Sequence, residues 1–239
     1  MRLYNKFNNF DFLTLNNILK ANTRSEKDIS FERKITCTKM QCFAIKSEII
    51  NLVVKHILQG NFIDFLDKCK IINYPISIIY GKVVTKICDY NLFIKYFEKY
   101  AQIIDCWAHC DIFKLNISKL GENNVKKFIN NLLKSDNPFL RRIAFVIMLK
   151  SFINSDEMSF IFDNIIKSYS EKDYYVNMSI AWLLCECFIK QKDQILNFIN
   201  HTKLNDFVLK KFISKCGDSF RVTKKDKDFS SLSKRINAV

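Results

Sequence analysis

The chain has 239 residues, 49% of them hydrophobic, which excludes a disordered protein and is enough to form a sizeable core. Its two prolines and four glycines provide too few turns for an all-β chain of this length. The 38 lysines and arginines against 24 aspartates and glutamates give a net charge of +14. This charge favours a polyanionic partner, nucleic acid or an acidic membrane surface, over a merely solvated basic surface.

The N-terminal region, residues 1–35, is polar and does not open with the apolar segment of a secretory signal. Its apolar spacing predicts one helix over residues 10–20. The charged stretch that follows, residues 24–34, predicts a loop. We therefore expect residues 1–35 to be a variable part that precedes the main domain.

Residues 36–220 are predicted to form an all-α domain. Apolar residues recur there at helical spacing, most clearly over residues 139–152. The segment Ser135-Asp136-Asn137-Pro138 is a strong helix-start signal, because a capping residue precedes a proline in the first turn. Glycines predict three helix ends, at Gly60, Gly81 and Gly121.

The breaks between helix-length segments fall at regular distances. Helix pairs recur about every 35 to 45 residues, a spacing typical of an α-solenoid (superhelix) of HEAT-like repeats in which each pair buries one face on its neighbours. An irregular helical bundle with the same number of helices fits this spacing equally well. The breaks fall near residues 60, 73–75, 90, 121, 136, 155, 172, 192 and 204.

The C-terminal region is the most basic part of the chain. Ten lysines and arginines accompany four aspartates between residues 203 and 235. The apolar residues from Leu204 to Phe220 predict one packed helix. Residues 221–239 are predicted to follow it as a basic tail.

Cysteine usage and hydropathy indicate the surroundings of the protein. The nine cysteines are an odd number and lie mostly in apolar sequence, which indicates free thiols in a reducing compartment. The longest clean apolar run, residues 143–149, is far shorter than the ~20 residues that a membrane helix needs. We therefore expect a soluble, cytoplasmic protein with no membrane partner. A monomer is the default expectation.

Several kinds of site are disfavoured by residue type and spacing. Cys106, His109 and Cys110 could share one helical face, but zinc sites usually draw ligands from two separated clusters, and no second Cys/His pair has suitable spacing. The three histidines lie in unrelated contexts, which disfavours an activated nucleophile. The four isolated glycines do not form a phosphate-binding loop. We predict no metal and no cofactor.

The two tryptophans stand in segments that also carry charge. Trp107 precedes Asp111 by four residues, so in a helix the indole and the carboxylate share a face. Such a pair can bind a cation between a negative charge and a π face. Trp182 lies in a second apolar segment, and the Arg141-Arg142 pair lies between the two tryptophans. The alternative is that both indoles are core residues and the arginines are surface charges.

Four segments in this order resemble a known family, the HEAT-like DNA alkylation repair proteins or AlkD-type DNA glycosylases. The segments are Trp-Ala-His-Cys-Asp at 107–111, residues 136–145, residues 173–182 and the basic residues 219–227. The resemblance extends over about residues 36–235 and favours the solenoid over the bundle. It implies a monofunctional, hydrolytic glycosylase that excises cationic N3- or N7-alkylpurines from duplex DNA and leaves an abasic site, without a cofactor.

The resemblance also implies roles for individual residues. Asp111 would oppose the positive charge that develops on the sugar and orient the attacking water, and the indoles would pack on the deoxyribose. Arg142 would bind a phosphate by two hydrogen bonds. The implied catalytic residues are Asp111, Trp107 and Trp182, and the implied phosphate-binding residues are Arg142, Arg141, Arg221, Lys224 and Lys225.

One segment departs from the family. Residues 42–48 stand where members usually carry a Gly-Val-Arg-x-Pro-like sequence near the first repeat, so that a glycine, an arginine and a proline are all replaced. This departure leaves two alternatives to the glycosylase open. One is a non-catalytic DNA-binding protein that recognises distorted or branched duplex, and the other is a protein-binding α-solenoid scaffold.

Overall fold

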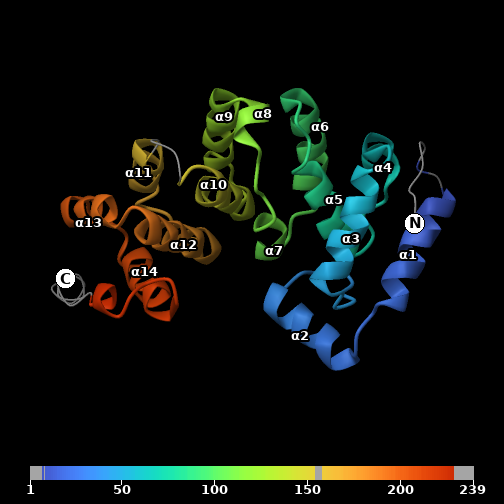
Figure 1. The fold of residues 1–239 in the computed structure, drawn as a ribbon, viewed down its shortest axis with the longest axis horizontal. Helices are drawn as coiled ribbons and strands as arrows, with labels where there is room; N and C mark the ends of the chain where they lie inside the picture. The colour runs from blue at the N-terminus through green and yellow to red at the C-terminus, as the bar shows by residue number, and fades with distance from the viewer. Residues whose placement is uncertain (1–6, 8, 154–157, 229–239) are drawn as a thin grey trace. The chain divides into compact units, whose positions relative to one another are not determined.

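The computed structural model describes residue 7, residues 9–153 and residues 158–228 (Figure 1). These residues form 14 α-helices and one short 3-10 helix, with no β-strand, which confirms the all-α class. The end of the predicted basic tail, residues 229–239, lies outside the described residues, as do the predicted break near residue 155 and the first six residues of the predicted N-terminal part. The chain divides into two compact units, residues 1–125 and 126–239, so the division falls inside the predicted 36–220 domain. The domain boundaries expected at residues 35 and 220 stay predictions.

The first unit is built around α5 (Tyr74–Val84), which packs against α3, α4, α6 and α7 (Figure 1). Helices α5 and α7 run in the same direction, because Ser77 contacts His109 and, one turn later, Gly81 lies against Ile112. The other helices of this unit are α1 (Asn9–Ala21), α2 (Glu26–Thr36), α3 (Ser47–Leu58), α4 (Phe62–Lys68), α6 (Tyr90–Ala101), α7 (Trp107–Cys110) and α8 (Ile117–Leu120).

The second unit is built around α12 (Tyr174–Lys190), which is buried along most of its length and packs against α10, α13 and α14. Helices α10 and α12 run in the same direction, because Arg142 contacts Tyr175 and, further along, Lys150 lies beside Trp182. Their neighbours α11 and α13 also meet, with the rings of Phe162 and Phe198 stacked 4.2 Å apart. The remaining elements of this unit are α9 (Glu122–Leu133), α10 (Pro138–Ser151), α11 (Met158–Lys167), α13 (Lys192–His201), α14 (Asp206–Asp218) and a 3-10 turn at Lys225–Lys227.

Helix pairs of this kind are consistent with the predicted α-solenoid of HEAT-like repeats. Asparagine and aspartate side chains start seven of the 14 described α-helices by accepting a hydrogen bond from a backbone N–H in the first turn. At the predicted start of α10, Asn137 Oδ1 accepts from the N–H of Phe139 at 2.9 Å, and Pro138 occupies the first turn. The same role is played by Asn61, Asn73, Asp89, Asn116, Asp173 and Asn205.

Two local predictions are wrong, and two are confirmed. Residues 24–34 do not form a loop, because α2 covers most of them; Ser25 caps this helix, and its largely exposed surface lacks the apolar spacing of a buried helix. Gly81 lies inside α5 rather than at its end. Its absent side chain makes room for a neighbouring helix, since a Cβ there would lie 2.4 Å from Ile112 Cδ1. The helices expected over residues 10–20 and after residue 204 are present as α1 and α14.

Among the described residues, no single helix is long and apolar enough to cross a membrane. Only α3 and α4 together pass a test of length and composition, and the chain bends by 111° between them.

Candidate functional site

The first candidate pair lies on α7, a helix of four residues. Cys106 is its N-cap in an extended conformation, and Asp111 follows as its C-cap, where its backbone N–H donates to the carbonyl of Trp107 at 3.1 Å. Trp107 and Asp111 therefore lie one turn apart, as their spacing predicts. Both side chains are partly exposed, which places them at the surface of the first unit rather than in its core.

The indole of Trp107 is held by a distant segment. Its Nε1–H donates to the carbonyl of Ile35 at 2.8 Å, in the last turn of α2. An indole has only this one donor, so the bond fixes the edge of the ring and hence its orientation. The helix that the sequence did not predict is thus the element that positions the predicted tryptophan.

Helix α7 carries a buried histidine. His109 is fully buried, and its Nε2 lies 2.7 Å from Oγ of Ser77, which in turn donates to the carbonyl of Tyr74 at 2.6 Å. Burial lowers the pKa of His109 to about 4, although the nearby Asp105 carboxylate acts in the opposite direction. The rings of Tyr74 and Tyr100 lie 5.5 and 6.0 Å from the imidazole. Helices α5 and α6 therefore hold the buried side of α7 through their contacts with His109.

Asp105 joins α7 to the segment that follows α2. Its carboxylate accepts hydrogen bonds from the hydroxyl of Thr38 at 2.8 Å and from the backbone N–H of Lys39 at 2.7 Å. Cys106 is buried beside it, and burial raises the pKa of the Cys106 thiol to about 12. Two polar contacts between residues 67 and 72 positions apart in sequence thus help to fix the chain around α7.

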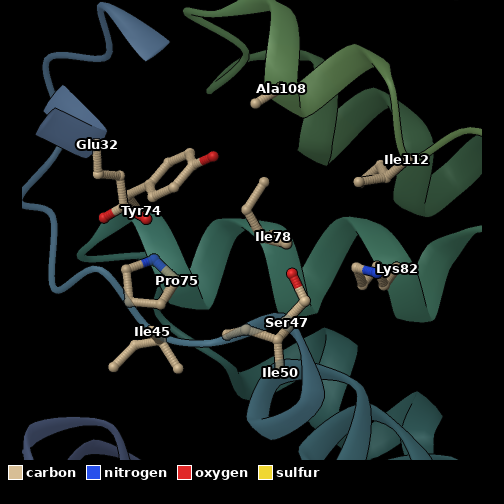
Figure 2. A pocket seen from close by; sticks show the side chains of 10 residues that line it. All are labelled: Glu32, Ile45, Ser47, Ile50, Tyr74, Pro75, Ile78, Lys82, Ala108 and Ile112. Atoms are coloured by element: carbon tan, nitrogen blue, oxygen red, sulfur yellow. The ribbon is translucent and has the colours of Figure 1, made fainter. Parts of the chain in front are cut away.

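A cavity of about 260 Å³ opens next to α7 (Figure 2). Ala108 of α7 and Ile112, just after this helix, line one side of it, and Tyr74, Ile78 and Lys82 of α5 lie along another (Figure 2). Sequence reasoning missed this cavity, because its walls come from four separate segments. The only local signal is the shared helical face of the α5 residues. The remaining lining residues are Glu32, Ile45, Ser47, Ile50 and Pro75.

Residues 42–48, the segment that differs from the usual sequence of the resembled family, form part of the wall of this cavity. Ala44 has a positive φ of 52°, and its backbone N–H donates to Glu32 Oε2 at 2.8 Å. The left-handed conformation is unfavourable for alanine by roughly 1–2 kcal/mol, so the hydrogen bond from α2 helps to hold the turn. Residues 42–48 are therefore shaped by α2.

The remaining candidates lie in the second unit. Trp182 of α12 is partly buried, and Nζ of Lys150 lies 6.0 Å from the centroid of its ring. Arg142 of α10 is buried, and its Nη1 donates to the carbonyl of Tyr175 at 2.7 Å. An arginine and a tryptophan thus lie on adjoining helices, both of which belong to the apolar core of this unit.

Arg141 and Arg221 have carboxylate partners within the unit. Arg141 makes two hydrogen bonds to Glu171, at 2.7 and 3.1 Å, and a further two to the carbonyls that precede α10. Arg221 pairs with Glu186 of α12. Lys224 and Lys225 are exposed next to the 3-10 turn.

Comparison with known families identifies the chain. The family model described as DNA alkylation repair enzyme matches residues 80–215, which is more than half of the chain. The chain belongs to the DNA alkylation repair enzyme family. No curated protein matches it. The family confirms the resemblance found in the sequence and gives the protein a role in DNA alkylation repair, with DNA as its substrate.

The candidate residues of this DNA alkylation repair protein fall into two groups. The structure brings Trp107 and Asp111 together in the first unit, and it places the other six in the second. The family match contains the tryptophans, Asp111, Arg141 and Arg142, and it ends before Arg221 and the two lysines. It also begins after α2, so the helix that holds Trp107 lies outside the matched part. The eight assignments stay predictions.

Proposed function

We propose that this DNA alkylation repair protein is a monofunctional glycosylase that hydrolyses the N-glycosidic bond of cationic N3- or N7-alkylpurines in duplex DNA. One observation carries the proposal. A partly exposed carboxylate, Asp111, lies one turn from a partly exposed indole, Trp107, whose orientation is fixed by its bond to Ile35. A carboxylate and a π face are the two groups that attract a cation at short range.

The reaction needs charge stabilisation more than acid catalysis. Alkylation at N3 or N7 gives the purine a positive charge, so the base departs as a neutral molecule and takes both electrons of the glycosidic bond. The sugar is left as an oxocarbenium ion, which Asp111 stabilises while it orients a water molecule towards C1′. Water adds there and loses a proton, which yields an abasic site. A preorganised charge of this kind is commonly the largest contribution to catalysis.

The tryptophan complements the carboxylate. The face of Trp107 would pack on the deoxyribose, with a cation–π attraction of about 0.5–2 kcal/mol that depends on how well the site excludes water. Because the indole N–H is already bonded to Ile35, the ring would meet the DNA without a change of orientation. Trp182 is proposed to pack on the sugar–phosphate backbone of the duplex.

The second unit is proposed to bind the phosphate backbone. Arg142 would give bidentate contacts once its buried guanidinium leaves the Tyr175 carbonyl, and the exposed Lys224 and Lys225 would add attraction without base specificity. Arg141 and Arg221 would reach a phosphate only if their ion pairs to Glu171 and Glu186 open. The net charge of +14 supports binding that weakens steeply with salt.

The test is release of 7-methylguanine or 3-methyladenine from a methylated duplex. Wild-type protein is expected to release the base, and Asp111→Asn is expected to lower the single-turnover rate by about 10²–10³-fold, the usual effect of removing one electrostatic stabiliser. Asp163→Asn is a matched control, because Asp163 is exposed on α11. Full activity in Asp111→Asn would contradict the role of Asp111. Salt-sensitive binding of duplex by a wild-type protein that releases no base would favour the non-catalytic DNA-binding alternative.

A further inference from the structure

Three potential metal ligands meet at the N-terminal end of α7. The Asp105 carboxylate, Cys106 Sγ and His109 Nδ1 all lie within 4.8 Å of one another. We propose that these three groups bind one divalent transition-metal ion, with Zn²⁺ as the best match, and that the ion fixes α7 to the body of the first unit. The site is independent of the proposed glycosylase reaction, in which none of its three ligands takes part.

The two distances from His109 Nδ1 to the other donor atoms match tetrahedral coordination, and the third distance, between the Asp105 carboxylate and Cys106 Sγ, is at most 4.8 Å. His109 Nδ1 lies 3.3 Å from Asp105 Oδ1 and 3.5 Å from Cys106 Sγ. A tetrahedral zinc ion with ligands at about 2.0–2.3 Å holds neighbouring donor atoms roughly 3.3–3.6 Å apart. Both distances fit an ion bound by His109 Nδ1 and each of the other two groups, and a separation of at most 4.8 Å between the other two donors lets a side-chain adjustment complete the site.

The hydrogen bonds around His109 leave its Nδ1 as an acceptor that can bind a cation. Ser77 has one O–H, which it donates to the Tyr74 carbonyl. The contact between His109 Nε2 and Ser77 Oγ therefore uses the single N–H of a neutral His109. The lone pair of Nδ1 then faces the Asp105 carboxylate, which is also an acceptor. The donors near Nδ1 are the Asp105 backbone N–H, at a long 3.4 Å, and the Cys106 thiol, at 3.5 Å, whose proton a metal ion would displace. The Nδ1 lone pair and the carboxylate repel each other, and a metal ion coordinated by both groups would remove this repulsion.

The groups around the site orient the ligands as metal sites require. A ligating histidine usually donates its other N–H to an acceptor, here Ser77 Oγ, and a ligating carboxylate is itself hydrogen-bonded, here by Thr38 and the N–H of Lys39. Thiolate, carboxylate and a divalent ion also sum to zero charge, which suits a buried place. Thiolate and imidazole together favour zinc over magnesium or calcium.

The sequence pattern pointed to a different third ligand. Helical spacing places Cys110 with Cys106 and His109, but the Cys110 thiol donates to the carbonyl of Cys106 at 3.5 Å. Asp105, which precedes the N-cap Cys106, lies beside His109 instead. The fourth position of a tetrahedral ion is left for water.

A metal here would have a structural consequence. A helix of four residues has no stability of its own, because the first turn costs more conformational entropy than its hydrogen bonds return. An ion bound at Cys106 and His109 would restrain the residue directly before Trp107 and the residue two positions before Asp111. The candidate pair would then be presented in a fixed geometry.

The test is metal content and coordination. Protein purified without chelator is expected to contain one equivalent of Zn²⁺ by elemental analysis. Chelator-stripped protein titrated with Co²⁺ is expected to show the thiolate-to-cobalt charge-transfer band and the intense visible bands of tetrahedral coordination. Absence of stoichiometric zinc together with absence of these bands in the wild-type protein would overturn the proposal, whatever the variants do.

Variants assign the ligands. Cys106→Ser and His109→Gln are expected to lose the charge-transfer band and the bound equivalent, whereas Cys110→Ser is a matched control on the same helix and keeps both. Thr38→Val preserves shape but removes the hydroxyl that orients Asp105, so zinc affinity is expected to fall by about 10- to 100-fold. Retention of zinc and of the cobalt spectrum in a folded Cys106→Ser protein would contradict the proposed site. Circular dichroism of each variant establishes that it is folded.

Discussion

The two groups of candidate residues rest on different kinds of scaffold. Trp107 and Asp111 lie on a helix of four residues that is held by polar contacts to Ile35, Ser77 and the segment after α2. Arg142 and Trp182 lie on helices of 14 and 17 residues that pack along an apolar interface. Polar contacts fix orientation and contribute modestly to stability, whereas apolar packing contributes most of the stability. We therefore expect the surroundings of α7 to be sensitive in geometry and the α10–α12 pair to be sensitive in folding.

The largest effect is expected in the core of the second unit. Phe145 of α10 is completely buried, so Phe145→Ala removes its packing and leaves a cavity. The free energy of unfolding is expected to fall by about 3–5 kcal/mol, measured by denaturant titration. The conservative change Ile147→Val, at an equally buried position, should lower it by only about 0.5–1.5 kcal/mol. Similar losses for both variants would contradict the idea that close packing carries this unit.

Gly81→Ala tests how closely α7 lies against its support. A Cβ at this position would lie 2.4 Å from Ile112 Cδ1 and 2.5 Å from the ring of Tyr100, so both side chains must move. Overpacking is expected to lower the free energy of unfolding by about 1–3 kcal/mol, although alanine favours a helix more than glycine does. Gly217→Ala is the control, because no atom lies near a Cβ at that position of α14. Equal stability of the two variants would show that α7 is free to shift.

Trp107→Phe separates orientation from stability. The change keeps an aromatic ring but removes the N–H that donates to Ile35. The free energy of unfolding is expected to fall by only about 1 kcal/mol, the usual net value of one hydrogen bond. Base release from methylated DNA should fall by more than this loss of stability explains, because the ring would no longer be oriented. An unchanged single-turnover rate would show that the bond to α2 is not needed for positioning.

Much of the fold was predictable, because it depends on local sequence. Asn137 and Pro138 start α10 as their types predict, and the four-residue spacing of Trp107 and Asp111 placed them one turn apart. Helix α2 was missed because its surface is largely exposed and carries little apolar periodicity.

The surroundings of the candidate site were not predictable in the same way. The contact of Thr38 with Asp105 joins residues 67 positions apart, and no local spacing encodes it. Gly81 was assigned to a helix end because glycine often ends helices, whereas here close approach of Ile112 and Tyr100 requires it. The walls of the cavity beside α7 likewise come from four segments. Tertiary contacts, rather than propensity, therefore determine the site.

The smallest effect is expected from the ion pair that Arg141 makes in the second unit. Burial tends to raise the pKa of Glu171, but hydrogen bonds from Arg141 and from the backbone N–H groups of Asp173 and Lys172 outweigh it, so that the pKa lies below its ordinary value of 4.5. A carboxylate with a lowered pKa stabilises the folded state above its ordinary pKa, and this contribution is lost as the pH falls through the lowered value.

The melting temperature of the wild-type protein should therefore fall more steeply than that of Glu171→Gln as the pH is lowered from neutral to below 4.5. At neutral pH the variant should be the less stable of the two, and the difference should shrink in acid. Asp163→Asn, on the exposed side of α11, is expected to keep the wild-type slope. If Glu171→Gln kept that slope as well, the ion pair would contribute nothing to folding. Arg141 would then be available to a phosphate at no cost in the stability of the second unit. The contrast between the polar contacts around α7 and the apolar packing of α10 and α12 would become sharper.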